Sequence, residues 1–297
     1  MNGSLSNKKP VILLVTGAWH APEHYAPLIA LLRSYGYTVH CPLLPSNSQS
    51  QPPANLDDDI LFIRPYALSL LSATDLVVLT HSYGGMVASY ALANLTQISP
   101  NRLTHLIYMT AFLPLPGESL CSIFGMVPPF LRPNPSTNNI GFIPNGPRIH
   151  FYQDCHPSQI DRAPGNAEKV YEALFAASDL PLAEAISQAQ ADAKRQLAAD
   201  PAAIIANPAL ADLQMAYDDP NVEVAYIHCT QDAGLLPQLQ EMMIGRVHDR
   251  WAQKASRKVA KGASAVIREE RIEAGHSPFL SRVDETARVV DCIIMGD

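Results

Sequence analysis

The sequence predicts an α/β protein with a mostly parallel six-stranded sheet that is flanked by helices. Short apolar runs alternate with helical patterns along the chain, which is the order that builds a parallel sheet covered on both faces. This alternation stops at residue 113 and resumes after residue 215. Of the 297 residues only 16% are charged, against ~25% in average domains, which indicates a large buried core. We therefore predict one core formed by residues 1–112 and 216–297, with a cap inserted at 113–215.

Six segments have the length and the apolar, often β-branched composition of buried strands. They are residues 11–16, 37–41, 76–80, 103–109, 222–228 and 265–272. Helical patterns follow these segments: one ends at Tyr35-Gly36, and others cover residues 57–72, 86–94, 238–244, 250–261 and 279–294. Three aspartates at the start of the helix 57–72 favour it through the helix dipole, whereas Pro65 leaves its middle open.

The predicted cap differs in composition from the rest of the chain. Residues 113–147 contain eight prolines, so we expect irregular chain there. A helix is predicted over 180–199, because five apolar residues share one face: Leu182, Ile186, Ala189, Ala193 and Leu197. Beyond the cap, the predicted helix 250–261 carries five basic residues: Arg250, Lys254, Arg257, Lys258 and Lys261. An anion site is one interpretation of this basic set, and a solvated helix face is the favoured one.

Composition and spacing exclude several classes of protein. A net charge of −7 argues against a nucleic-acid or anionic-membrane partner, which would need a basic face. Residues 76–101 carry no charged side chain, but polar residues interrupt this stretch, so a buried strand and helix are favoured over a membrane span. The five cysteines form no CxxC pair and fit buried thiols of a reducing compartment, so we expect a cytoplasmic protein. No metal-binding histidine spacing and no phosphate-binding loop occurs, so we expect neither a metal nor a cofactor.

The strongest chemical signal lies where the strand 76–80 meets the following helix. A strand, a turn of small residues and a helix form the setting of a nucleophile elbow, G-x-S-x-G, in which Ser82 is the candidate nucleophile. Gly84 supplies the second glycine, whereas Thr80 replaces the first. The backbone N–H of Tyr83 is then a candidate donor to the oxyanion. An ordinary polar turn before a helix is the alternative interpretation.

The other parts of a catalytic triad follow in the required order. The loop after the first strand contains Gly17, and the N–H of Ala18 is the candidate for the second oxyanion donor. Asp232 comes after the fifth strand and His276 after the sixth. Each of the two is, taken alone, equally well explained as a loop residue. Their order after Ser82, and their shared position at the carboxyl ends of strands, favour a triad with His276 as base and Asp232 as its orienting acid.

Other residues near these loops have weaker assignments. Glu273 lies too near His276 in sequence to orient it, and Asp218 and Asp219 precede the fifth strand. Further residues are expected in or beside the substrate pocket: Trp19 and His20 at its mouth, and His81 as packing or a wall. Phe112 and other apolar residues of the cap are expected either as a pocket wall or as the core of the cap.

The chain resembles an α/β-hydrolase of the group that contains plant methylesterases, hydroxynitrile lyases and their microbial relatives. The matching segments are residues 17–20, 81–85, 108–114, 151–155, 229–232 and 274–279, which span nearly the whole chain. The resemblance implies Ser82 as nucleophile, Asp232 as acid and His276 as base, with the N–H groups of Ala18 and Tyr83 as oxyanion donors.

Two departures from the family pattern are visible. Thr16 stands where many relatives have histidine. The spacing between Asp232 and His276 exceeds the usual one because of the predicted helix at 250–264, which we expect to change the site rim or an oligomer contact. A homodimer is one arrangement that the sequence allows.

These observations predict a serine hydrolase that cleaves an ester or lactone of a mostly apolar small molecule through an acyl-enzyme. A lyase or cyclase that uses the same triad for acid–base chemistry is the alternative, since a fold does not fix a reaction. A binding protein without turnover is disfavoured by the intact triad. Hydroxynitrile lyases of this family carry a lysine after the catalytic histidine and a hydroxyl residue in the first loop. This chain has Ser277 and Gly17 at those pocket positions, so we expect no cleavage of cyanohydrins.

Overall fold

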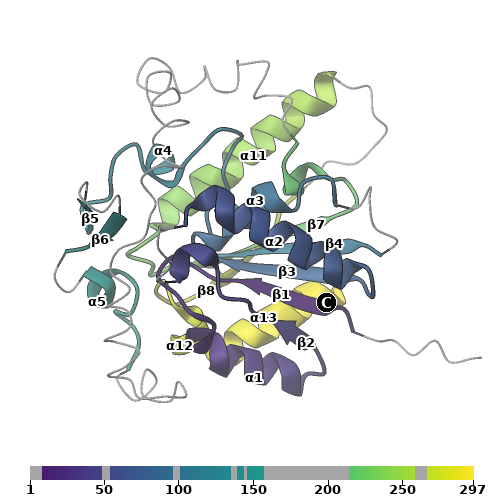
Figure 1. Cartoon of the computed structure of the whole chain (residues 1–297), viewed down its shortest axis with the longest axis horizontal. Coiled ribbons are helices and arrows are strands. Elements are labelled where there is room, and N and C mark those ends of the chain that lie inside the picture. Colours follow the sequence, from purple (N-terminus) through teal and green to yellow (C-terminus); the bar gives the residue numbers. More distant parts are fainter. Residues whose placement is uncertain are drawn as a thin grey trace, which may run out of the picture.

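The computed structural model describes residues 9–48, 54–95, 101–134, 139–143, 146–156, 214–257 and 266–297. Its main sheet has six strands: β1 (Val11–Val15), β2 (Thr38–His40), β3 (Leu76–His81), β4 (Leu103–Met109), β7 (Glu223–Cys229) and β8 (Arg268–Ile272). Their spatial order is β2-β1-β3-β4-β7-β8, and all neighbouring strands are parallel (Figure 1). The predicted α/β fold is therefore confirmed. The strands β1 and β3 are buried along their whole length, as parallel strands covered on both faces are.

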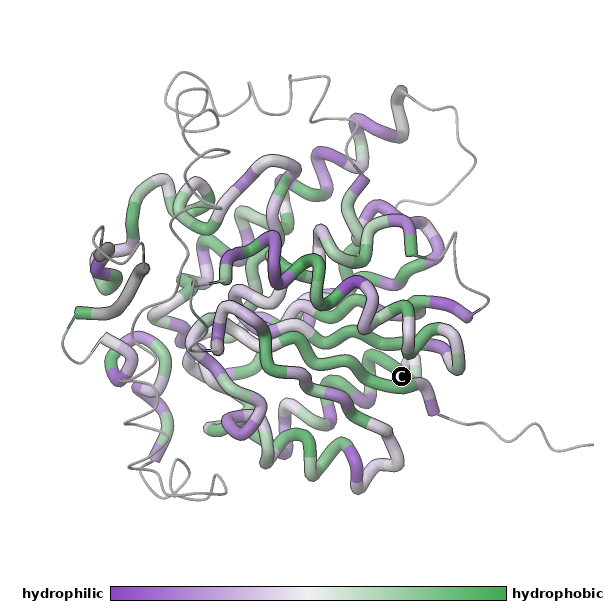
Figure 2. The backbone as a smooth tube through the Cα atoms, viewed as in Figure 1, coloured by the Kyte–Doolittle hydropathy of each residue, from purple (hydrophilic) through white to green (hydrophobic). Residues whose placement is uncertain are grey.

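Helices cover both faces of this sheet. One side carries α2 (Leu56–Leu71), α3 (Gly84–Ala91) and α11 (Pro237–Arg257). The other carries α1 (Ala26–Ser34), α12 (Pro278–Ser281) and α13 (Val283–Met295), and α1 packs against α13 (Figure 1). Hydrophobic residues concentrate in the strands between these two layers (Figure 2).

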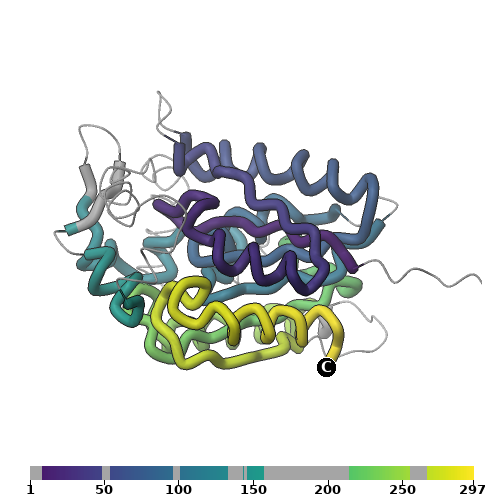
Figure 3. The backbone as a smooth tube through the Cα atoms, turned by 90° about the horizontal axis from the view of Figure 1, so that it is seen from below, coloured from purple at the N-terminus to yellow at the C-terminus, as the bar shows by residue number. Residues whose placement is uncertain are grey.

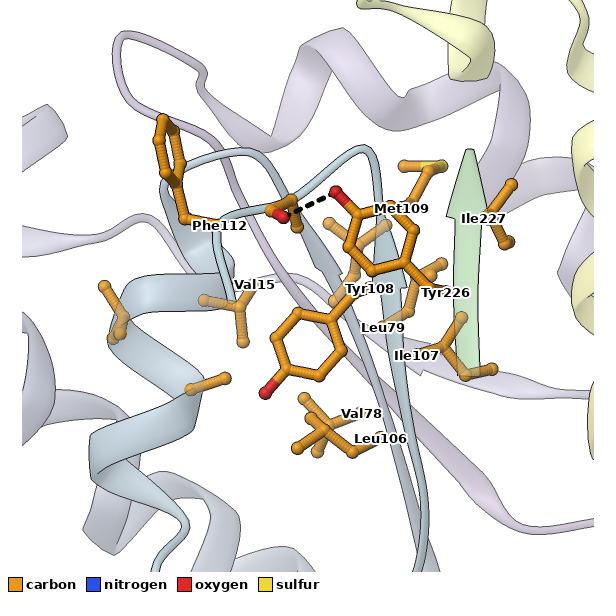
Figure 4. Packing of buried hydrophobic residues seen from close by; sticks show 14 of the residues in the cluster. Val15, Val78, Leu79, Leu106, Ile107, Tyr108, Met109, Phe112, Tyr226 and Ile227 are labelled. Atoms are coloured by element: carbon orange, nitrogen blue, oxygen red, sulfur yellow. Dashed lines mark hydrogen bonds between the residues drawn. The ribbon is translucent and has the colours of Figure 1, made fainter. Parts of the chain in front are cut away.

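Two buried tyrosines stack in the centre of the core. Tyr108 on β4 faces Tyr226 on β7 with nearly parallel rings whose centroids are 6.3 Å apart (Figure 4). The hydroxyl of Tyr226 donates to the carbonyl of Ala111 over 2.8 Å, and that of Tyr108 bonds the Ser89 hydroxyl over 2.7 Å. Both polar groups are therefore satisfied, as buried groups must be. This packing fixes the carboxyl ends of two strands from which candidate site residues follow.

Two predicted helices are in fact one. The sequence predicts separate helices over 238–244 and 250–261, but α11 runs without a break from Pro237 to Arg257. Gly245 lies between the two predicted segments, and its cost of about 1 kcal/mol relative to alanine does not end a helix whose neighbours Met243 and Val247 are fully buried.

The basic residues of this helix, expected to face solvent, are not all exposed. Arg250 is buried and, together with Lys254, pairs with the buried carboxylate of Asp218, each at 2.7 Å. Burial acts to raise the pKa of Asp218, but the hydrogen bonds from the two cations outweigh it and lower that pKa. The pattern of charges could not show this, because Asp218 lies in a separate 3-10 turn, Ala216–Asp218.

The start of the predicted cap is more regular than its prolines suggested. It contains α4 (Leu120–Phe124), an antiparallel pair β5 (Leu131–Asn134) and β6 (Asn139–Phe142), and α5 (Gly146–His150). These elements lie at the end of the sheet toward which the strands point (Figures 1 and 3). The helix predicted over 180–199 lies outside the described residues. The division into core and cap stays a prediction.

Two smaller expectations have different outcomes. Pro65 does not interrupt α2, since it lies on the exposed side of that helix. Of the five cysteines, which we expected to be buried, only Cys229 is, and Cys292 is exposed. Within the described chain, no helix has both the length and the apolar character needed to cross a membrane.

Candidate active site

Ser82 lies at the sharp turn between β3 and α3, with a φ of 50° that non-glycine residues seldom adopt. Two glycines allow this turn to pack closely. A Cβ on Gly84 would lie 2.3 Å from the carbonyl oxygen of Val15, and one on Gly85 would lie 2.2 Å from that of Phe112. The structure therefore has the strained strand-to-helix turn that the nucleophile elbow requires.

Thr80, which replaces the first glycine of the elbow motif, fits because it still belongs to β3. It is fully buried, and its hydroxyl donates to the carbonyl of Ile107 on the neighbouring strand β4 over 3.2 Å. The hydroxyl that threonine adds at this position of the motif is therefore paired.

The three predicted triad residues lie together in hydrogen-bonding order. The Nε2 atom of His276 is 2.9 Å from the Ser82 hydroxyl, and its Nδ1 atom is 2.7 Å from Oδ2 of Asp232. A carboxylate only accepts, so Nδ1 carries the proton and Nε2 of the neutral ring can accept the serine proton. Glu273, the rejected acid, instead accepts from the side chain of Gln231 over 2.9 Å.

Asp232 is surrounded by donors. Its Oδ1 atom accepts the N–H groups of Gly234 and Leu235 over 2.7 and 2.8 Å. Its Oδ2 atom accepts from His276 and also from the hydroxyl of Thr110. Thr110 has a φ of 39°, which is unusual for a β-branched residue. We did not predict this contact. In the sequence, Thr110 appeared only within the segment 108–114, which resembles the family.

The two candidate oxyanion donors flank the serine. Gly17 is so close to the elbow that a Cβ on it would lie 3.1 Å from Cβ of Ser82. The N–H of Gly17 donates to the hydroxyl of Tyr25 over 2.9 Å and is not available to a ligand. Among the described residues, no hydrogen bond uses the N–H of Ala18 or of Tyr83. These two groups therefore remain the candidate oxyanion donors.

His81 and His20 have structural partners on both ring nitrogens. The Nε2 atom of His81 donates to the carbonyl of His276 over 2.9 Å, and its Nδ1 atom accepts the Tyr25 hydroxyl over 2.7 Å. In His20, Nδ1 donates to the Ala18 carbonyl and Nε2 accepts from Tyr152, each over 2.7 Å. Burial lowers the pKa of both histidines well below its usual value, so both are neutral. They hold the surrounding loops in place and do not act as second bases.

Asn47, which the sequence did not single out, holds the loop that contains Ala18. Its side-chain amide donates to the carbonyls of Gly17 and His20, each over 2.9 Å, and its oxygen accepts the N–H of Trp19 over 2.9 Å. A weaker contact of 3.3 Å reaches the hydroxyl of Thr16. The loop therefore keeps its shape through one side chain from a separate 3-10 turn, Pro45–Asn47.

Aromatic rings extend from the base toward the cap. The ring of Phe151 packs against His276 with centroids 4.7 Å apart, and Trp19 and Phe130 pack against Phe151 at 6.2 and 6.0 Å. Phe112, one of the predicted pocket residues, contacts Phe124 at 5.7 Å. These buried and partly buried side chains form an aromatic cluster next to His276.

Ser277, the predicted pocket residue that follows the base, is fully buried. Its hydroxyl has no hydrogen-bond partner within the described parts of the chain.

A short segment after α5 contacts the loops of the acid and of the base. The side-chain amide of Gln153 donates to the carbonyl of Gln231 over 2.8 Å, and Asp154 accepts the N–H of Gly275 over 2.7 Å. A Cβ on Gly275 would lie 2.5 Å from the Asp154 carboxylate, so only glycine fits there without a shift. In the sequence, Gln153 and Asp154 belong to the segment 151–155, which resembles the family, but no role was predicted for them.

The described residues hold no group of three or more His, Cys, Asp or Glu side chains that could bind a metal ion. The arrangement of a serine, a histidine, an aspartate and two unpaired N–H groups is suited to acyl transfer.

This fold and this site define the alpha/beta hydrolase class. A family model described as the alpha/beta hydrolase family matches residues 12–289, and the chain belongs to that family. Curated relatives include the alpha/beta hydrolase nvfD of Aspergillus novofumigatus, 34% identical over 117 residues, which are 38% of this chain and 47% of that protein. A carbendazim hydrolyzing esterase of Nocardioides is 31% identical over 135 residues, 43% of this chain and 52% of that one. The chain thus spans about half the length of the curated relatives it matches.

Solved structures show the same fold over nearly the whole chain. A pyrethroid hydrolase from Sphingobium faniae has a TM-score of 0.58 at 17% identity and covers 96% of this chain and 97% of its own. A methylesterase from Arabidopsis has a TM-score of 0.62 at 16% identity, with coverage of 97% and 100%.

Proposed function

We propose that the protein is a carboxylic ester hydrolase in which Ser82 is the nucleophile, His276 the base and Asp232 the orienting acid. The observation that carries this proposal is the continuous hydrogen-bond chain from Ser82 through His276 to Asp232, with distances of 2.9 and 2.7 Å. Two further observations support it, namely the unpaired N–H groups beside the serine and the names of relatives, which include an esterase.

The geometry supports an acyl-enzyme route. His276 takes the proton of Ser82 as the hydroxyl oxygen attacks the ester carbonyl carbon, and Asp232 stabilises the imidazolium. The N–H groups of Ala18 and Tyr83 bind the oxyanion of the tetrahedral intermediate. The intermediate collapses, the ester C–O bond breaks and His276 gives its proton to the leaving alcohol. Water, activated by the same histidine, then hydrolyses the acyl-enzyme and regenerates Ser82.

The proposed substrate is an ester or lactone of a mostly apolar small molecule. The aromatic cluster of Trp19, Phe130 and Phe151 beside His276 supports an apolar acyl or alcohol group. The reaction needs no cofactor or metal. Relatives described as a carbendazim hydrolyzing esterase and a pyrethroid hydrolase support hydrolysis of a small molecule.

An ester panel tests the proposal. Purified protein is offered p-nitrophenyl acetate, a methyl aryl ester, a lactone and, as the lyase alternative, mandelonitrile, each corrected for spontaneous breakdown. We expect turnover of at least one ester or lactone and no cyanide release, because neutral Ser277 follows the base and Gly17 has no side chain to hold a substrate hydroxyl. Cyanide release without turnover of any ester or lactone would refute the proposed function.

A further inference from the structure

A buried carboxylate outside the proposed triad connects the two sides of the proposed oxyanion hole. Asp59, on α2, has no exposed surface. Its Oδ1 atom accepts the N–H of Ser46 over 2.9 Å, and its Oδ2 atom accepts the hydroxyls of Ser46 and Tyr83 over 2.5 and 2.8 Å. Tyr83 is the elbow residue whose N–H is one of the two candidate oxyanion donors. The carboxylate is thus bonded directly to one side of the hole.

The other side is reached through the neighbour of Ser46. Asn47 belongs to the same 3-10 turn and bonds the backbone of Gly17, Trp19 and His20. These three residues surround Ala18, whose N–H is the second candidate donor. Asp59 is therefore connected to Tyr83 through the tyrosine hydroxyl and to the loop of Ala18 through the 3-10 turn Pro45–Asn47.

We propose that Asp59 is a positioning residue that sets the separation of the Ala18 and Tyr83 N–H groups in the oxyanion hole. This inference rests on the proposed function. Oxyanion donors act only when they lie 2.7–3.1 Å from the developing negative charge, so small displacements of either side weaken catalysis. Asp59 touches neither the substrate site nor the triad, and it acts only through Tyr83 and the turn at Ser46.

The choice of a carboxylate at this position supports the inference. Burying a carboxylate is costly, and burial raises the pKa of Asp59 to about 6. Asp59 also forms no ion pair in the described chain that would offset this cost. An ionised carboxylate, however, accepts several hydrogen bonds at once, and here it accepts three from two separate segments. An apolar residue could fill the same space but could not form hydrogen bonds to both segments.

The test uses variants that cut the connection without removing bulk. Tyr83→Phe removes only the hydroxyl from a ring that is almost fully buried, and Asp59→Asn keeps the side-chain shape. Tyr90→Phe is the control, since Tyr90 lies near the end of α3, away from the elbow in sequence. Its hydroxyl accepts the N–H of Gly117 over 3.1 Å and contacts the carbonyls of Leu115 and Glu118 at 3.4 and 3.3 Å. Each variant and the double variant are assayed with p-nitrophenyl acetate and with phenylboronic acid, which forms a tetrahedral adduct with a serine.

We expect Tyr83→Phe and Asp59→Asn to lower kcat about 10-fold with KM within about twofold, since complete loss of one donor costs about 10²–10³. Affinity for phenylboronic acid should fall by the same factor. The double variant should be no slower than the slower single variant, because both cut one connection. Tyr90→Phe should stay within about twofold of the wild type.

The inference would be wrong, with the proposed function intact, if the wild type were active and kcat were unchanged in Tyr83→Phe. Fully additive losses in the double variant would have the same meaning. A loss seen equally in Tyr90→Phe would also overturn it, since it would show a general effect of helix packing. A wild type that neither turns over esters nor reacts with a fluorophosphonate would refute the proposed function, and this inference with it.

Discussion

His276 and Asp232 are 44 positions apart in the chain, yet Nδ1 of the histidine lies 2.7 Å from Oδ2 of the aspartate. The contact forms because β7 and β8 are parallel neighbours, so the loops that follow them lie at the same edge of the sheet. The proposed acid is thereby held beside the histidine by tertiary structure, whereas the nearby Glu273 bonds Gln231.

Replacing the acid should therefore be far more damaging than replacing its neighbour. We expect Asp232→Asn to lower kcat by about 10⁴, because an amide at this position favours the wrong histidine tautomer. Glu273→Gln should change kcat less than about threefold. Steady-state kinetics of both variants with the best ester of the panel checks this. A larger loss in Glu273→Gln would show that the acid has been assigned wrongly.

Thr110 should tune the base through the acid. Its hydroxyl donates to the same Asp232 oxygen as His276, so Thr110→Val concentrates negative charge on that oxygen and favours the imidazolium. We expect kcat/KM to fall about 3- to 10-fold and the acidic limb of its pH profile to move to higher pH. Thr110→Val keeps the β-branched shape and removes only the hydroxyl. Thr110→Ser keeps a hydroxyl and should have the pH profile of the wild type. An activity loss without a shifted profile would indicate a packing role only.

Tyr25 should stabilise the site as well as the fold. Tyr25→Phe leaves the buried Nδ1 of His81 and the N–H of Gly17 without partners, and each unsatisfied group costs about 1–3 kcal/mol. We expect the two unsatisfied groups together to lower the unfolding free energy by about 2–6 kcal/mol, measured by urea denaturation. Tyr66→Phe is the control, since its hydroxyl bonds only a half-buried His40 at 3.1 Å. Equal losses in the two variants would contradict the described network.

Asp59 should make stability depend on pH in a defined direction. Burial raises its pKa from 3.8 to about 6, so the folded state binds this proton more tightly than the unfolded state. The stabilisation is fully present below pH 3.8 and is lost as the pH rises through 6. Asp59→Asn cannot ionise, so between pH 4 and pH 7 its unfolding free energy should gain about 2 kcal/mol relative to the wild type. A difference that is constant with pH would contradict this.

The sequence predicted the fold and singled out the candidate site because both leave local signals. Strand runs, the elbow around Ser82, and the positions of Asp232 and His276 just after strands can each be recognised within about ten residues. Contacts that join distant segments leave no such signal. Thr110 meets Asp232 across 122 positions, and Tyr25 meets His81 across 56.

The prediction of two helices in place of α11 failed for a related reason. Gly245 weakens the local helical pattern, but burial of Met243 and Val247 against the core compensates. Likewise, Arg250 and Lys254 looked solvated until the fold placed Asp218 beside them. The local sequence determines the helix propensity, whereas tertiary packing decides whether the helix continues.

Labelling with a fluorophosphonate, followed by mass spectrometry of the labelled peptide, tests the central claim most directly. We expect one modified residue, Ser82, in the wild type, and no labelling and no ester turnover in a Ser82→Ala variant that melts at nearly the same temperature. Undiminished ester hydrolysis by Ser82→Ala, or a label on another residue, would contradict the proposed triad.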